Sequence, residues 1–152
     1  MSEASDTRPL LVLEDNNEDF ATLKRLMRKQ GLTNPVFHCV TGQEVLDFLR
    51  HQGPYNDPAT APRPSLILLD LNVPGKDGRA VLQEIKSDET FKHIPVAIFS
   101  TSTNAKDVAF CYAYGANTYL VKPVDLGKLT RNLQLFFEYW LTVSVLHDDP
   151  QP

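Results

Sequence analysis

Cysteine is scarce in this sequence, and its few cysteines are not grouped. The chain of 152 residues holds two, Cys39 and Cys111, and each stands alone in an apolar context. A disulfide framework or a zinc site would need more cysteines at closer spacing, so we expect two buried, reduced thiols. The four histidines also lack ligand spacing, which disfavours a zinc or iron site.

Basic clusters and long apolar runs are also missing. The net charge is −4, and Lys and Arg form no block, so direct nucleic-acid binding is disfavoured. The segment Met1–Pro9 has no apolar signal core, and no stretch is long enough to span a bilayer. We therefore expect a cytoplasmic protein with no membrane attachment. A hydrophobic content of 42% is enough for one ordinary core, and the length predicts one domain.

What the sequence does contain is a set of short apolar runs, each of which stops at a polar residue. The runs and the residues that follow them are Leu10–Leu13 before Glu14 and Asp15, Leu66–Leu69 before Asp70, Val96–Phe99 before Ser100, and Tyr119–Val121 before Lys122. If these runs are parallel strands of one sheet, their polar ends meet at one edge, which is where open α/β sheets bind ligands.

Amphipathic stretches with a period near 3.6 residues alternate with the apolar runs, which favours an α/β fold. The expected strands are Leu10–Glu14, Val36–Val40, Leu66–Leu71, Val96–Ser100 and Thr118–Val121. The expected helices are Glu18–Gln30, Gln43–His51, Arg79–Ser87, Ala105–Tyr114 and Leu126–Trp140 or a little longer. Five such units predict a flavodoxin-like, doubly wound, five-stranded parallel sheet of order 2-1-3-4-5 with five helices.

The expected domain spans residues 9–146 and ends in an extended helix. Residues 1–8 and 147–152 are expected to be flexible ends. The segment 53–64 contains four prolines, which argue against regular structure, so we expect an exposed inserted loop there.

The three carboxylates predicted at the sheet edge would repel one another unless a cation joined them. Mg²⁺ is the natural partner, because it prefers oxygen ligands and is usually held by one or two carboxylates plus a phosphate. Glu14, Asp15 and Asp70 are therefore candidate ligands, with the backbone carbonyl of Asn72. Asp70 would be a nucleophile for a phosphoryl group, whose oxygens Mg²⁺, Lys122 and Ser100 would bind.

As a set, these residues resemble the receiver domain of two-component response regulators, from Pro9 to about Trp140. The resemblance implies that Asp70 is the phosphorylated aspartate, Lys122 the phosphate-binding lysine and Ser100 the switch hydroxyl. It further implies that Tyr119 is the aromatic switch residue, and that the bond from Lys122 to Pro123 is cis.

Two features depart from the commoner pattern of that family. The acidic pair is Glu14-Asp15 rather than two aspartates, which leaves open whether Glu14 meets the metal directly or through water. The switch hydroxyl belongs to serine rather than threonine. The resemblance also implies that Asn72 and Ser102 border the path of the attacking water and tune the phosphoryl lifetime.

Several details resemble one subgroup, the single-domain response regulators paired with bacterial phytochrome histidine kinases. That likeness implies a phosphoacceptor signalling protein and not a turnover enzyme, with only Mg²⁺-dependent self-phosphorylation from small donors and self-dephosphorylation. Its kinase partner would be phytochrome-type, and its output would be a surface of helix 4, strand 5 and helix 5 that meets another protein.

The last predicted helix is more apolar than one core-facing stripe requires. The stripe itself is Leu126, Leu129, Leu133, Phe136, Phe137 and Trp140. The apolar surplus is Leu135, Tyr139, Val143 and Leu146, with Phe110 and Tyr114 on the preceding helix. We expect a homodimer here, with Phe110, Tyr114, Leu135, Phe136, Tyr139 and Trp140 as the dimer or partner surface.

Three rival interpretations remain. A flavodoxin would need a hydroxyl- and glycine-rich phosphate loop, but the segment 14–19 is made of acids and amides. An aspartate-nucleophile phosphatase of the haloacid dehalogenase type would carry an acid where Asn72 stands. The third is a degenerate receiver that acts only as a protein-binding module.

Overall fold

The computed structural model describes residues 8–147 and contains five strands and five α-helices in alternation. The strands are Leu10–Leu13 (β1), Val36–Cys39 (β2), Leu66–Leu69 (β3), Val96–Ser100 (β4) and Thr118–Val121 (β5). The helices are Asn17–Lys29 (α1), Gly42–Arg50 (α2), Gly78–Ser87 (α3), Ala105–Ala113 (α4) and Leu126–Glu138 (α5). These bounds agree with the predicted elements to within two residues at each end. No helix in this part of the chain is long and apolar enough to cross a membrane.

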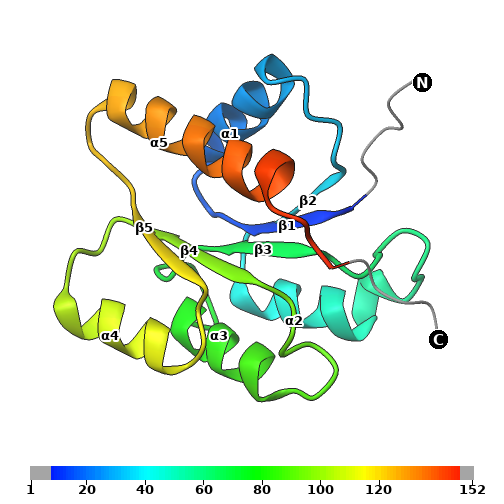
Figure 1. Ribbon diagram of the computed structural model, residues 1–152. Coiled ribbons are helices and arrows are strands. Elements are labelled where there is room, and N and C mark those ends of the chain that lie inside the picture. The colour runs from blue at the N-terminus through cyan, green and yellow to red at the C-terminus, as the bar shows by residue number, and fades with distance from the viewer. Residues whose placement is uncertain (1–7, 148–152) are drawn as a thin grey trace.

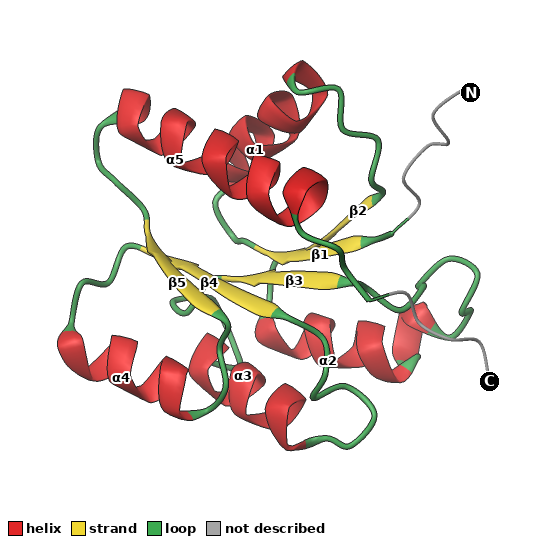
Figure 2. Ribbon diagram, viewed as in Figure 1, coloured by secondary structure: helices red, strands yellow, loops and turns green. Residues whose placement is uncertain are grey.

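The strands form one parallel sheet of order β2-β1-β3-β4-β5 (Figures 1 and 2). Helices α1 and α5 cover one face, and α2, α3 and α4 cover the other. The predicted flavodoxin-like topology is confirmed. From β1 the chain first adds β2 on one side of the sheet and then β3, β4 and β5 on the other. The carboxyl ends of β1 and β3 therefore flank the crevice where such sheets bind ligands.

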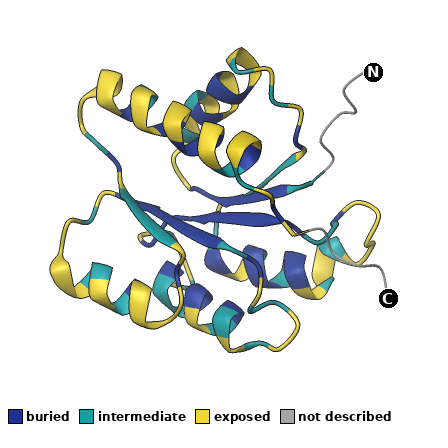
Figure 3. Cartoon of the chain, viewed as in Figure 1, coloured by how far each residue is buried: buried dark blue, intermediate teal, exposed yellow. Residues whose placement is uncertain are grey.

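The central strands are buried on both faces, which is why their sequences are apolar without alternation. Leu11, Leu13 and Ile67 face the core under α2 and α3, and Leu10 and Val12 face the core under α1 and α5. Figure 3 shows the central strands β1, β3 and β4 dark blue between helices whose outer sides are exposed, whereas the edge strands β2 and β5 are mostly half-buried.

The inserted segment 53–64 is more ordered than its prolines indicate. It begins with a single 3₁₀ turn, Gly53–Tyr55 (η1), whose Tyr55 ring stacks edge-on against Phe48. Ala61 is buried, and its carbonyl oxygen lies 2.8 Å from a ring nitrogen of His51. The segment is therefore anchored to α2 near both of its ends.

In the C-terminal region, three side chains differ in burial from the sequence-based expectation. Helix α5 widens into one π-helical turn, Tyr139–Val143 (η2), and the chain leaves the helix at Ser144 in an extended conformation. Leu146 then returns to the core and is buried, so it is not part of an exposed surface. Phe136 is also buried, whereas Leu126 at the start of α5 is exposed and does not join the core.

The expected flexible ends lie outside the described residues, apart from Arg8 and His147. Arg8 Nη1 donates a hydrogen bond to the carbonyl oxygen of Leu146, at 3.3 Å, and its own carbonyl accepts one from the Asn34 side chain, at 3.1 Å. The two ends of the described chain therefore meet beside β1.

Candidate functional site

Three carboxylates meet where β1 and β3 end. These strands pair in register as far as Leu13 and Leu69, so the next residues, Glu14 and Asp70, lie side by side. One carboxylate oxygen from each of Glu14, Asp15 and Asp70 lies within 4.8 Å of the others. Glu14 and Asp70 are buried, whereas Asp15 is exposed. The acid cluster expected from the sequence is therefore present and open to solvent through Asp15.

The Lys122 ammonium group reaches this cluster from the end of β5. Its Nζ lies 2.6 Å from Glu14 Oε1 and 3.1 Å from Asp70 Oδ2. A third acid, Asp19 in the first turn of α1, lies 3.2 Å from the same nitrogen. Lys122 Nζ also lies 5.2 Å from the centre of the Phe99 ring, within the range of a cation–π contact.

Burial and neighbouring charges shift the pKa values of Glu14 and Lys122 in opposite directions. Burial raises the pKa of the Glu14 carboxyl to about 7, although Lys122 pulls it down. Burial by itself would lower the pKa of Lys122, but the hydrogen bonds and charges of Glu14 and Asp70 outweigh it and raise that pKa. The ammonium group therefore stays charged at neutral pH and compensates the buried acids.

The backbone after Asp70 is held close to it. The Asn72 N–H donates to Asp70 Oδ1 at 3.3 Å. Helix α3 begins at Gly78, whose backbone passes directly against Asp70 and Leu71; a Cβ at position 78 would overlap the Asp70 carbonyl oxygen. Only glycine permits this approach, which fixes the turn that follows the candidate nucleophile.

The two predicted switch residues lie on the neighbouring strands. Ser100 is fully buried at the end of β4, and its Oγ accepts a hydrogen bond from Ser102 N–H at 3.2 Å. The Tyr119 hydroxyl on β5 donates to the Ser102 carbonyl oxygen at 2.9 Å. Both residues therefore contact the same loop after β4.

The expectation of a cis peptide bond before Pro123 is wrong for this structure. None of the peptide bonds between residues 8 and 147 is cis, so the Lys122–Pro123 bond is trans. The trans form is favoured even before proline, and the Lys122 ammonium reaches Asp70 with the bond in that form.

Sequence reasoning missed two parts of this region. Asp19 lies in the first turn of α1, which begins just after the acids that end β1, and this position in the sequence could have identified it. Asp107 on α4 contacts both Ser102 and Arg79 of α3. These residues belong to separate elements and have no common sequence pattern, so nothing in the sequence pointed to them.

The donor set suits a divalent cation of the Mg²⁺ type. Carboxylate oxygens are the ligands that Mg²⁺ prefers, and an exposed Asp15 leaves room for the waters that this ion keeps. No sulfur or imidazole belongs to the cluster, so softer metals are not favoured.

A groove runs between β5 and α5, beside the expected partner surface. It has a volume of about 470 Å³, and Leu135 and Tyr139 on its rim are 52% and 54% exposed. Trp140 is half-buried in its wall. Phe110 and Tyr114 stack on each other, with ring centres 4.5 Å apart, and Tyr114 faces a separate hollow beside Gly115.

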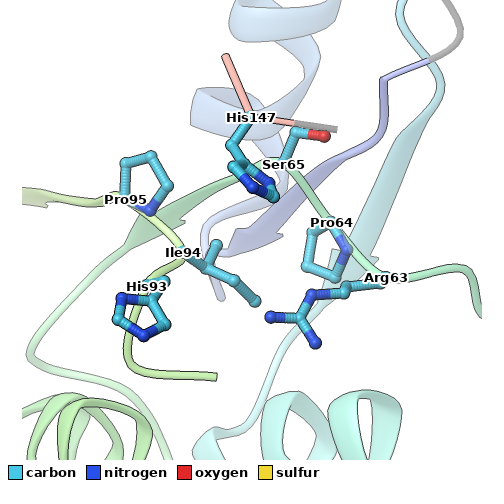
Figure 4. Close-up of a pocket in the computed structure, with 7 residues that line it drawn as sticks. All are labelled: Arg63, Pro64, Ser65, His93, Ile94, Pro95 and His147. Carbon is cyan, nitrogen blue, oxygen red and sulfur yellow. The ribbon is translucent and has the colours of Figure 1, made fainter. Parts of the chain in front are cut away.

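A smaller cavity of about 280 Å³ lies at the opposite edge of the sheet, where β3 and β4 begin (Figure 4). Its walls are Arg63, Pro64, Ser65, His93, Ile94, Pro95 and His147. Because it adjoins the amino ends of the strands, it is separate from the acid cluster.

Comparison with known proteins identifies the family to which this chain belongs. Residues 10–134 match the response regulator receiver domain. The chain is 35% identical over 144 residues to the response regulator Rcp1 of Synechocystis sp., covering 95% of this chain and 96% of Rcp1. It is 36% identical over 140 residues to the probable methanogenesis regulatory protein FilR2 of Methanothrix harundinacea, covering 91% and 87%.

Solved structures agree in fold and sequence. The phosphorylated cyanobacterial phytochrome response regulator RcpA superposes with a TM-score of 0.87 at 38% identity, over 94% of this chain and 100% of RcpA. The Mn²⁺-bound form of Rcp1 superposes with a TM-score of 0.88 at 35% identity, over 93% and 99%. This chain therefore belongs to the response regulator receiver domain family and is related to the phytochrome response regulators.

Proposed function

We propose that this protein is a response regulator that accepts a phosphoryl group on Asp70 from the phosphohistidine of a sensor histidine kinase. The observation that carries the proposal is the 3.1 Å contact between Lys122 Nζ and Asp70 Oδ2 inside the acid cluster. The carboxylate lies beside a cation that can also balance the charge of an incoming phosphoryl oxygen.

In this reaction an Asp70 carboxylate oxygen attacks phosphorus while the phosphorus–nitrogen bond to the kinase imidazole breaks. The electron pair leaves with the imidazole nitrogen, which takes a proton from water. No general base is required, because the attacking group is a carboxylate and not a hydroxyl. Lys122 would bind one phosphoryl oxygen, and the Ser100 hydroxyl would donate to another.

Glu14, Asp15, Asp70 and the Asn72 carbonyl would hold Mg²⁺ at this site. When bound, the ion would neutralise charge on the phosphoryl oxygens and orient them. The relatives support this assignment: Rcp1 has been crystallised with Mn²⁺, and RcpA in its phosphorylated form. The contacts of Lys122 with Glu14 and Asp70 mean that the lysine would share these two acids with the ion.

Labelling with acetyl phosphate and Mg²⁺, followed by intact-mass measurement, tests the acceptor. Asp70→Asn should abolish labelling. Asp125→Asn is the matched control, because Asp125 follows β5 at the same sheet edge and asparagine caps a helix as well as aspartate does. Labelling of Asp70→Asn at the wild-type rate would contradict the proposal, and labelling that is equal with a chelator would contradict the metal requirement.

We assign the kinase partner to the phytochrome class, on the strength of the relationship to RcpA and Rcp1. Phosphotransfer profiling tests this assignment. A phytochrome-type kinase should phosphorylate the protein within seconds to minutes, much faster than unrelated kinases at the same concentration. Equal transfer from all kinases would contradict it.

The output surface is proposed to be α4, β5 and α5, with a second copy of the chain in the groove beside β5. β5 is the last strand of the sheet formed by residues 8–147, so no strand of that part of the chain pairs with its outer side. Next to it, Leu135, Tyr139 and Val143 are more than half exposed, which is unusual for aromatic and aliphatic side chains grouped on one helix. A self-complementary contact of this kind would have two-fold symmetry.

A further inference from the structure

The carbonyl oxygen of Glu14 lies at the point where the pairing of β1 with β2 stops. The Glu14 N–H still donates to the Cys39 carbonyl oxygen at 3.0 Å, in line with the parallel register of the two strands. The next donor in this ladder would be the Thr41 N–H, but that group donates to Glu44 Oε1 at 2.9 Å, in the capping box of α2. Because Glu14 is buried, its carbonyl oxygen needs a donor from outside the two backbones.

The side chain of His38, on β2, supplies that donor. Its Nε2 lies 2.6 Å from the Glu14 carbonyl oxygen. A carbonyl oxygen can only accept a hydrogen bond, so the ring carries a proton on Nε2 and donates it. The same ring stacks on Phe20 near the start of α1, with ring centres 3.6 Å apart and planes within 10° of parallel. The imidazole is therefore held between the end of β1 and the beginning of α1.

Asp15 lies between these two contacts in the chain and has little support of its own. The Glu14 carboxylate is fixed at both oxygens, by Lys122 Nζ at 2.6 Å and by the Asn16 N–H at 3.1 Å. The Asp15 carboxylate makes no hydrogen bond or ion pair with any residue of the described chain. Its direction therefore depends on the backbone that carries it. The Glu14 carbonyl and the Asp15 N–H belong to one planar peptide group, so a donor on that oxygen fixes the plane at Asp15.

We propose that His38 is a positioning residue for the divalent cation, which directs Asp15 toward Glu14 and Asp70 by holding the Glu14–Asp15 peptide group. The inference rests on the proposed Mg²⁺ site and adds to it a residue that does not touch the ion. A metal site binds tightly only when its ligands are held in place before the ion arrives. Removal of a group that orients a ligand from behind commonly weakens metal binding about 10-fold or more.

Titration of the whole protein with Mn²⁺, the ion found in crystals of Rcp1, tests this role. The electron paramagnetic resonance signal of the free ion gives the dissociation constant. His38→Phe keeps a flat ring against Phe20 but removes the donor, and the constant should rise about 10-fold. His38→Gln places an amide N–H at about the reach of Nε2, so it should recover most of the wild-type affinity.

The matched control is His51→Phe. A ring nitrogen of His51 also lies 2.8 Å from a backbone carbonyl oxygen, that of Ala61, but in the segment that precedes β3 rather than at the acid cluster. This variant loses a hydrogen bond of the same kind and should bind Mn²⁺ as the wild type does.

A purely structural role gives a different pattern. If His38 only supports the fold, His38→Phe should unfold at a lower urea concentration while its Mn²⁺ affinity stays at the wild-type value, and that result would overturn the inference. Equal weakening in His38→Phe and His38→Gln would also overturn it, because the donated N–H would then not be the cause. Either result leaves the proposed function intact. If Asp70→Asn does not weaken Mn²⁺ binding, or the wild type binds none, the proposed metal site fails, and the role of His38 fails with it.

Discussion

Lys122 Nζ lies 3.1 Å from Asp70 Oδ2, although the two residues are 52 positions apart in the chain. The side chains of both are more than 90% buried, so neither charge could be kept without the other at low energetic cost. The same pairing that stabilises the fold therefore presents a carboxylate beside a cation, which is the arrangement that phosphoryl transfer needs.

Lys122→Gln should lower the free energy of unfolding by about 3 kcal/mol in a chelating buffer at neutral pH, because it leaves buried acids without their partner. Urea denaturation measures the change. Lys128→Gln on the exposed first turn of α5 is the control and should change stability by less than about 0.5 kcal/mol. Equal stability of Lys122→Gln and the wild type would contradict this account of the site.

The sequence was sufficient to predict the sheet and the acid cluster, for a simple physical reason. Four apolar runs with polar ends can form one parallel sheet in which all of those ends share an edge. Residues such as Asp15, Asp70 and Lys122 then meet without any knowledge of loop geometry. The order of the strands and the register of β1 with β3 follow that expectation.

The contacts between separate helices could not be predicted in this way. Arg79 and Asp107 are 28 residues apart on α3 and α4, and a single charged pair leaves no periodic pattern. Helical periodicity also predicts which side of a helix is apolar, but not how far along the helix that side is buried. Leu126 shares the apolar face of α5 but lies beyond the cover of the sheet, whereas the π-helical turn and the extended chain after it return Leu146 to the core.

Gly78→Ala should destabilise the protein by about 1–3 kcal/mol, because the added methyl group would overlap the backbone of Asp70 and Leu71. Thermal or urea unfolding provides the measurement. The matched control is Gly127→Ala in the first turn of α5, where the added methyl group would meet one side-chain oxygen of Asp125 at 3.1 Å and no backbone atom; its effect should stay within about 1 kcal/mol. A neutral Gly78→Ala would show that the turn after Asp70 can relax.

Ser100→Ala should accept phosphate from acetyl phosphate but respond weakly to it. Without Oγ, no hydroxyl at this position can donate to the phosphoryl group, and the Ser102 N–H loses the hydrogen bond that it donates to that oxygen. The Tyr119 ring resonance before and after addition of beryllofluoride, a phosphoryl mimic, reports the response, and it should shift much less than in the wild type. Thr103→Ala, an exposed change in the same loop, is the control. A full Tyr119 shift in Ser100→Ala would remove Ser100 from the switch.

Leu135→Glu should convert a wild-type homodimer into a monomer. Leu135 is 52% exposed on the rim of the groove between β5 and α5, and a carboxylate there would be desolvated without a partner if a second copy covered it. Light scattering at micromolar concentration, with and without beryllofluoride, gives the mass directly.

The matched control for this change is Leu126→Glu. Leu126 is 63% exposed on the same helix but is nine residues earlier, which places it on the opposite side of α5. It should leave the dimer intact, whereas general destabilisation by a new charge would affect both variants alike. A wild type that is monomeric in both states would rule out the second copy as the occupant of the groove and leave that surface to a different protein partner.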